Sequence, residues 1–161
     1  MILALLAPGL VACATPEAMT VGAGGSPANP SARYRNAVAV RSVSGGEAMN
    51  VLTVPGVANE PFKAALESTL AANGYLARPG SQKFYLDAEI QNLDQPLIGL
   101  DLDVVASVTY RISGAGAAAA YPIKTKGTAT FSDSPIAADR MRIANERAMR
   151  ENLKQFLEAL R

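Results

Sequence analysis

The chain has 161 residues, of which 49% are hydrophobic, and its 15 basic and 14 acidic side chains leave a formal net charge of +1. This near-neutral charge gives no electrostatic support for a nucleic-acid partner. The chain contains no histidine and only one cysteine, which excludes Ser-His-Asp and Cys-His catalysis, an internal disulfide and the usual zinc sites. We therefore expect no cofactor and no metal site.

The segment that leads to the single cysteine is the most informative part of the sequence. An apolar run over residues 1–6 is followed by Pro8-Gly9 and then by Leu10-Val11-Ala12-Cys13. Pro8-Gly9 would interrupt a helix or a strand, and the run is too short to span a bilayer. A buried N-terminal element with an ordinary cysteine is therefore the less favoured interpretation.

Leu10-Val11-Ala12-Cys13 resembles the lipobox of bacterial lipoproteins, in which an aliphatic, a permissive and a small residue precede an invariant cysteine. The resemblance implies that residues 1–12 are a signal peptide removed before Cys13, whose thiol then carries acyl chains such as palmitate. The chain departs from the pattern in one respect, because no Lys or Arg precedes Cys13 although a secretory signal has a basic n-region. We expect that the start codon has been assigned too late and that Met1 lies inside the apolar core of the signal.

Residues 13–32 are predicted to form the lipidated cysteine and a flexible tether. Ala, Pro, Gly and Ser dominate this segment, and Glu17 is its only charged residue. Such a composition offers little apolar surface to offset the entropy of ordering the chain. As a flexible coil the tether would reach roughly 25 Å. The glycines at 22, 24 and 25 are not expected to form a phosphate loop, because no strand precedes them and no helix follows.

Residues 33–161 predict one periplasmic domain, which is long enough to bury its own core. Its first strand is expected over Asn36 to Val43. The connection from Ser44 to Ala58 exceeds the usual length and is either a candidate binding loop or an irregular crossover that covers one edge of the core. A helix is predicted from Glu60 to Asn73, with Asn59 as its N-cap.

Three strands with strict alternation follow, over residues 83–91, 100–112 and 121–131. A period of two indicates that one face of each strand is buried and the other is wet. The connections between them are short and predict an antiparallel meander. One of them contains the Ala115 to Ala120 tract, which we interpret either as filler or as a loop that touches acyl chains or a barrel wall.

The last helix is predicted from Ser134 to Leu160, with Pro135 at its first position. Opposite charges four residues apart, such as Glu146 and Arg150, are expected to pair on its exposed side. The element order is therefore β-α-β-β-β-α. It predicts an α+β fold in which two helices pack on one face of a four-stranded, mainly antiparallel sheet.

The lipobox, the low-complexity linker and the small β-α-β-β-β-α domain together resemble the lipoprotein subunit of the lipopolysaccharide-assembly translocon. Several uncharacterised outer-membrane lipoproteins of the same size share this element order. The resemblance implies an accessory protein of the cell envelope that faces the periplasm. In enterobacteria an Asp directly after the lipidated cysteine retains a lipoprotein at the inner membrane. Here that residue is Ala14, which resembles outer-membrane sorting.

Four carboxylates are the main candidate site within the domain, and all are expected on the wet face of neighbouring strands: Asp87, Glu89, Asp101 and Asp103. They are candidate partner-binding residues. A hydrolase that uses them is the rival hypothesis, and a soluble secreted binding domain is a third. An open sheet face offers no cleft that excludes water or raises a carboxyl pKa. We therefore expect a non-enzymatic lipoprotein that binds a protein or lipid partner.

Overall fold

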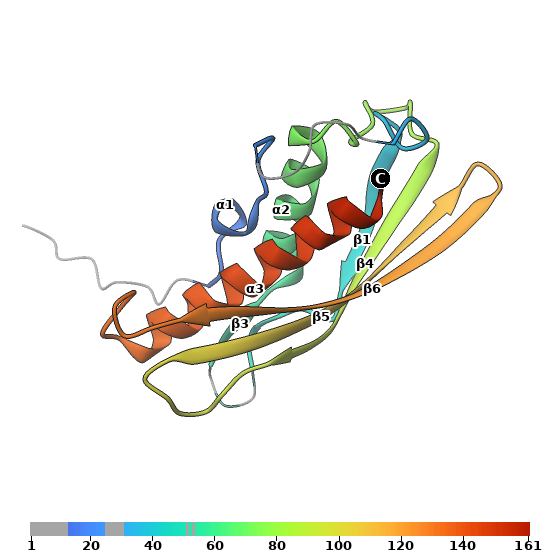
Figure 1. Cartoon of the computed structure of the whole chain (residues 1–161). Helices are drawn as coiled ribbons and strands as arrows, with labels where there is room; N and C mark the ends of the chain where they lie inside the picture. The colour runs from blue at the N-terminus through green and yellow to red at the C-terminus, as the bar shows by residue number, and fades with distance from the viewer. Residues whose placement is uncertain (1–12, 25–30, 51, 53) are drawn as a thin grey trace, which may run out of the picture.

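The computed structural model describes residues 13–24, 31–50, 52 and 54–161 (Figure 1). The predicted signal peptide, with Leu10, Val11 and Ala12, lies outside these residues. The helices are α1 (Pro16–Met19), α2 (Asn59–Ala72) and α3 (Ala137–Ala159). The strands are β1 (Val38–Ser44), β2 (Glu47–Met49), β3 (Pro55–Val57), β4 (Phe84–Asp94), β5 (Leu102–Gly114) and β6 (Ala117–Ala129).

The main sheet has four strands in the order β1-β4-β5-β6. Strands β4, β5 and β6 are antiparallel neighbours, whereas β1 is parallel to β4 because the chain crosses over between them through α2. The predicted α+β class and the mainly antiparallel sheet are therefore confirmed. The long connection after β1 contributes a separate two-stranded antiparallel sheet, β2-β3, which the sequence did not predict.

The alternation in the sequence places one side of each central strand in the core. The buried residues are Phe84, Leu86, Ala88 and Ile90 on β4, and Leu102, Val104, Ala106, Val108, Tyr110 and Ile112 on β5. Strand β6 lies at the edge of the sheet and contains Pro122, which an edge strand tolerates because its missing N–H need not join a ladder.

The meander differs from the prediction at its turns. Ala115 and Gly116 both have positive φ and form a two-residue hairpin turn between the paired residues Gly114 and Ala117. The predicted alanine loop is therefore wrong from Ala117 onward, because 117–120 extend β6. At the other end, residues 100 and 101 precede β5, so Asp101 lies in a connection and not on a strand.

The helices contact different parts of the sheet. Helix α3 lies along β5 and β6, α2 contacts β1, and α1 contacts both α2 and α3 (Figure 1). At Gly127 a Cβ atom would lie 2.2 Å from the backbone nitrogen of Ala148, so the glycine permits the close approach of α3 to β6. The predicted cap at Asn59 is wrong, because its side chain instead accepts a hydrogen bond from the N–H of Gly46, and α2 begins after Ala58.

The predicted flexible tether is wrong for its first part, because residues 14–21 pack against the domain. Ala14, Met19 and Val21 are buried in the same core cluster as the sheet. The Val21 N–H donates to the hydroxyl of Thr69, and the Asn73 amide donates to the Val21 carbonyl, each at 3.0 Å. The composition of the segment predicted that nothing would compensate the entropy lost on ordering it. The three buried apolar side chains and these hydrogen bonds compensate that loss.

Candidate functional site

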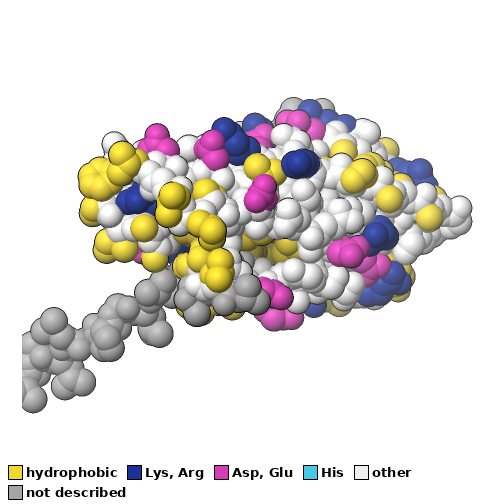
Figure 2. Space-filling model, turned by 90° about the horizontal axis from the view of Figure 1, so that it is seen from below, with side chains coloured by type: hydrophobic (Ala, Val, Ile, Leu, Met, Phe, Trp, Pro, Cys, Tyr) yellow, Lys and Arg dark blue, Asp and Glu magenta, His cyan; other side chains and the backbone are white. Residues whose placement is uncertain are grey.

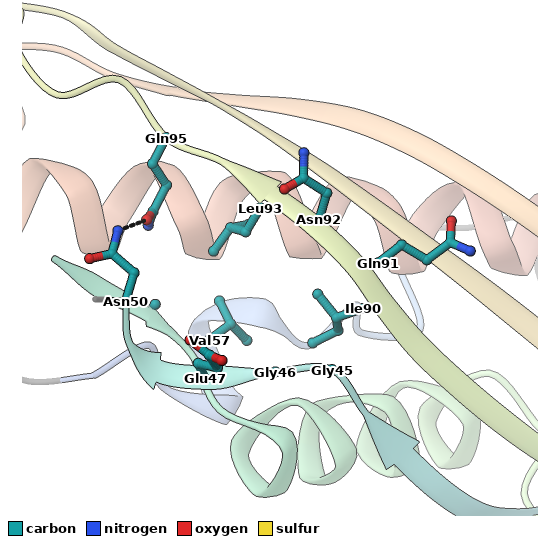
Figure 3. A pocket seen from close by; sticks show the side chains of 11 residues that line it. Gly45, Gly46, Glu47, Asn50, Val57, Ile90, Gln91, Asn92, Leu93 and Gln95 are labelled. Carbon is teal, nitrogen blue, oxygen red and sulfur yellow. Dashed lines mark hydrogen bonds between the residues drawn. The ribbon is translucent and has the colours of Figure 1, made fainter. Parts of the chain in front are cut away.

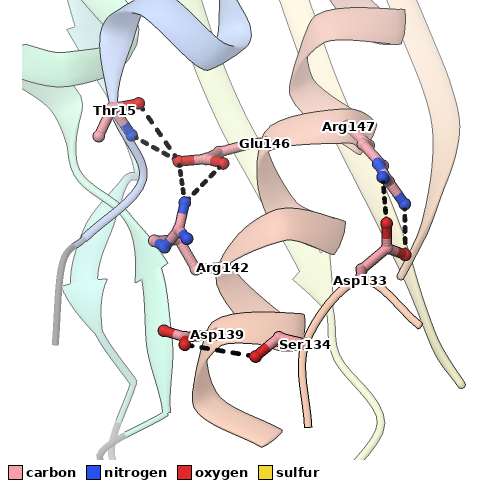
Figure 4. Close-up of polar contacts among 7 residues, drawn as sticks. All are labelled: Thr15, Asp133, Ser134, Asp139, Arg142, Glu146 and Arg147. Carbon is pink, nitrogen blue, oxygen red and sulfur yellow. Dashed lines mark hydrogen bonds and ion pairs between the residues drawn. The ribbon is translucent and has the colours of Figure 1, made fainter. Parts of the chain in front are cut away.

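The candidate acylation residue lies directly beside the folded domain. Cys13 is partly exposed, whereas the next residue, Ala14, is buried. The backbone N–H of Thr15 then donates to Glu146 Oε1 at 2.9 Å (Figure 4). Thr15 is bound to α3 and lies two residues after Cys13. Any group attached to Cys13 is therefore held close to the surface of the domain.

Glu146 is the side chain that fixes this segment. Its side chain is only 7% exposed, and its carboxylate pairs with Arg142 at 3.0 Å, one helical turn earlier. A buried carboxylate needs such a cation and hydrogen-bond donors, because leaving it unpaired would cost much of its hydration energy. The expected Glu146–Arg150 pair does not form, since Glu146 turns toward the N-terminal segment. The sequence signal for this contact is weak because it joins residues 131 positions apart.

The four predicted partner-binding carboxylates do not form one cluster. Asp87 on β4 pairs with Arg41 of β1, Glu89 on β4 with Arg111 of β5, and Asp103 on β5 with Lys126 of β6. The pairing register places Glu89 opposite Thr109 and Asp103 opposite Thr128, so the two acids are not neighbours. Asp101 is exposed in the connection before β5.

The pairing of these carboxylates determines their chemistry. The Arg41 hydrogen bond holds the pKa of Asp87 below its usual value, and hydrogen bonds from Thr128 and Lys126 do the same for Asp103. A general acid needs the opposite shift, toward a pKa near the working pH. Within the described ranges, no group of three or more His, Cys, Asp or Glu residues could hold a metal ion. The use of these carboxylates in partner binding remains a prediction.

The connection after β1 lines a pocket of about 290 Å³ against β4 (Figure 3). One wall is the backbone of Gly45 and Gly46, and the other is the side of β4 around Ile90 to Leu93. At Gly45, a Cβ atom would lie 2.1 Å from the Ile90 carbonyl oxygen, so glycine is needed where the two segments approach. The connection that the sequence predicted as a candidate binding loop therefore lines a small groove.

The same connection also covers one end of the core, which was the alternative interpretation. The Pro55 carbonyl of β3 accepts hydrogen bonds from Asn145 at 2.8 Å and Gln95 at 2.7 Å. Gln95 in turn accepts from Asn50 at 3.2 Å, a contact that is drawn in Figure 3. These amides tie β3, α3 and the end of β4 together. The connection therefore both covers the core and lines a groove.

Comparison with known proteins supports the fold. No protein-family model matches the chain, and no curated protein matches it. A Caulobacter crescentus CB15 protein named a "putative lipoprotein" has a similar structure, with a TM-score of 0.51 and 17% identity over 76% of this chain and 86% of that one. At such identity the likeness shows the fold alone.

Two further solved structures are similar. The hypothetical protein CT253 from Chlamydia trachomatis has a TM-score of 0.56 and 12% identity, over 78% of this chain and 98% of that one. Protein XCC0632 from Xanthomonas campestris, of family model DUF330, has a TM-score of 0.53 and 10% identity, over 82% and 89%. The chain therefore shares its fold with these three proteins.

Within the described part of the chain, no helix combines the length and the apolar character that crossing a membrane requires.

Proposed function

We propose that this protein is a lipoprotein of the bacterial cell envelope, acylated on Cys13 and anchored in the outer membrane with its α+β domain in the periplasm. Three observations support the proposal: the lipobox sequence before Cys13, the similar fold of a protein named as a lipoprotein, and the place of Cys13 at the domain surface. The first of these carries it, because the lipobox is the pattern in which a cysteine is acylated, and the partial exposure of Cys13 is compatible with that modification.

The domain acts as a non-enzymatic accessory or binding component of an envelope assembly or transport system. The carboxylates that an alternative hydrolase would use are paired with cations, which keeps Asp87 and Asp103 ionised rather than available as acids. A small groove beside β4 and the outer face of the sheet remain as surfaces for a protein or lipid partner.

Acylation is tested by growing cells with an alkyne analogue of palmitate and separating membranes from soluble material. The wild-type protein is expected to carry the label and to sediment with membranes. The Cys13→Ala variant is expected to lose the label and to appear in the soluble fraction. The exposed Ser81→Ala variant is the matched control and should behave as wild type. Label retained by Cys13→Ala would contradict the proposal.

The binding role is tested with the tagged, acylated protein captured from detergent-solubilised envelopes. A double variant with Asp101→Asn and Asp103→Asn removes two exposed carboxylates, one of which pairs with Lys126. A binding protein that uses this face is expected to lose partner capture while its stability changes little. A hydrolase would instead show turnover of a glycan substrate that these substitutions abolish, and that result would overturn the non-enzymatic role.

A further inference from the structure

Large apolar side chains are exposed around three connections: residues 95–101, residues 130–136 and the described residues 50, 52 and 54 that follow β2. These connections lie at the same end of the ribbon in Figure 1. Among the described residues, every exposed large apolar side chain except Tyr85 lies in these connections or directly beside them. We call this surface the apolar end, and its members are Met49, Leu52, Leu97, Ile98, Leu100, Phe131 and Ile136.

The exposure of these side chains is extensive. Leu97 is 74% exposed, Ile98 90% and Leu100 73%, all within one connection of seven residues. Figure 2 shows the largest group of hydrophobic side chains at the left end of this face, with smaller groups elsewhere. Single exposed apolar residues are normal, but a contiguous group marks a surface that contacts a membrane or another molecule.

Polar contacts hold the connections of the apolar end together. Arg140 of α3 donates to the Ser134 carbonyl at 2.8 Å, and its guanidinium lies 5.5 Å from the centre of the Phe131 ring. A second guanidinium nitrogen of Arg140 reaches the Gly99 carbonyl at 3.5 Å. The arrangement presents the apolar side chains from a surface that is already formed, so little entropy is lost when they contact a partner.

Cys13, the proposed anchor, lies near the N-terminal half of α3, and the apolar end adjoins the start of the same helix. Thr15 is bound to Glu146 in the N-terminal half of α3, and α3 begins directly after the 130–136 connection (Figure 4). Two extended residues span about 7 Å, so Cys13 cannot move far from the domain. A bilayer that receives acyl chains from Cys13 would therefore lie against this part of the molecule.

We propose that the apolar end inserts into the surface of the bilayer that holds the acyl chains of Cys13. The inference rests on the proposed acylation and adds a second point of contact, which fixes how the domain is oriented on the membrane. Leu97, Ile98 and Leu100 supply most of the inserted surface. Side chains of this kind bury about 5–10 Å deep, at the boundary between headgroups and acyl chains.

The charges around the apolar end determine which lipids it requires. Asp101 lies in one connection and Asp139 in the first turn of α3, while Asp133 is neutralised by Arg147 at 2.6 Å. Among the described residues of this surface, Arg140 is engaged by the Ser134 and Gly99 carbonyls and Arg147 by Asp133, so neither is left to attract anionic headgroups. Insertion therefore depends on burial of apolar area, and it should occur in zwitterionic lipid and persist at high salt.

The test uses the acylated protein in phosphatidylcholine vesicles, with acylation confirmed by intact mass. Because the Cys13 thiol is blocked by its acyl chains, an added cysteine can be labelled alone with a fluorophore. The Ile98→Cys variant reports on the apolar end, and Ala118→Cys, an exposed position near the β5–β6 turn, is the matched control. Lipids brominated on their acyl chains are expected to quench the label at 98 about twofold and to leave the label at 118 unchanged.

Each other outcome overturns the inference. If an acylated protein shows no quenching at 98, the apolar end stays in water and only the proposed anchor survives. If the label at 98 is shielded in proportion to protein concentration but is not quenched by lipid, the apolar end joins two copies of the chain. If the protein carries no acyl chains, the proposed function and this inference fail together.

A second measurement does not depend on a label. The triple variant Leu97→Ser, Ile98→Ser and Leu100→Ser should leave acylation intact but let the protein transfer between vesicles about 10- to 100-fold faster, because it removes the inserted side chains. The matched triple variant Ala117→Ser, Ala118→Ser and Ala120→Ser changes the opposite end and should transfer at the wild-type rate. Equal rates for all three proteins would contradict insertion.

Discussion

The two ends of the sheet differ in the apolar side chains that they expose. The apolar end exposes Leu, Ile and Phe side chains on three connections, whereas the β5–β6 turn at the other end exposes mainly Ala and Gly. An exposed alanine leaves little apolar surface in water, but an exposed leucine or isoleucine leaves far more. The folded domain gains nothing from placing such residues in connections.

The N-terminal segment strengthens this contrast. Residues 14–21 pack against α2 and the middle of α3 and bring Cys13 to the domain, while the β5–β6 turn lies far from them in Figure 1. One end of the molecule therefore combines the candidate anchor with unburied apolar surface, and the other has neither. The difference is the one that the proposed attachment at this end would produce, and the following predictions test it.

The largest effect is expected at Met19, which is fully buried in the packed N-terminal segment. Met19→Ala should lower the free energy of unfolding by about 2–5 kcal/mol, because it removes buried apolar volume and leaves a cavity. The control is Met49→Ala, at a half-exposed methionine of the apolar end, which should change stability by less than about 0.5 kcal/mol. Chemical denaturation of both variants checks this. Equal effects would show that residues 14–21 are not part of the domain.

Glu146→Gln should have the next largest effect, a loss of about 1–2 kcal/mol, because it removes the charge that Arg142 pairs with in a buried position. The N-terminal segment should also open more often, which limited proteolysis or amide exchange at residues 14–21 would detect. Glu151→Gln, at a partly exposed residue of the same helix, is the control. Faster exchange in the control alone would contradict the assigned contact.

A smaller effect on stability is expected from the protonation of Asp133, which lies in the 130–136 connection at the apolar end. The Arg147 hydrogen bond holds the pKa of Asp133 well below its usual value. The carboxylate therefore stabilises the fold above the unfolded pKa of about 3.9, and this stabilisation is lost as the pH falls toward the folded pKa. Asp133→Asn should make the unfolding free energy decline less steeply below about pH 4. Thermal unfolding measured as a function of pH checks this prediction. The same pH dependence in the variant and the wild type would show that Asp133 does not stabilise the fold.

The smallest effect on stability is expected at the most exposed residues of the apolar end. The triple serine variant at Leu97, Ile98 and Leu100 should change the unfolding free energy of the domain by less than about 1 kcal/mol, because these side chains are already exposed. Its vesicle transfer rate should nevertheless change strongly. A large loss of stability would mean that the three residues serve the fold rather than the membrane.

The sequence predicted the features that depend on local periodicity. Alternation along β4 and β5, and the apolar stripe of α2, identified elements that the structure contains within a few residues. Their buried faces repeat at short range, so each strand or helix carries its own signal. Turn residues were harder, because the positive φ of Ala115 is imposed by the hairpin that Gly116 completes and not by the alanine itself.

Contacts between distant segments could not be predicted. The composition of residues 14–21 indicated a tether, and nothing in it pointed to Thr69 or Glu146 as partners. The four candidate carboxylates were separated by the pairing register, which sequence alternation alone does not set. The apolar end was missed for the same reason, since its members lie in three connections that only the fold brings together.

The central claim is that Cys13 carries acyl chains that hold the adjacent domain at a membrane. Intact-mass analysis of the protein purified from its native membranes tests this most directly. The account predicts a chain that begins at Cys13 and is heavier than the sequence from that residue by the mass of its lipid groups. A chain with an unmodified cysteine, or one that retains the residues before Cys13, would contradict it.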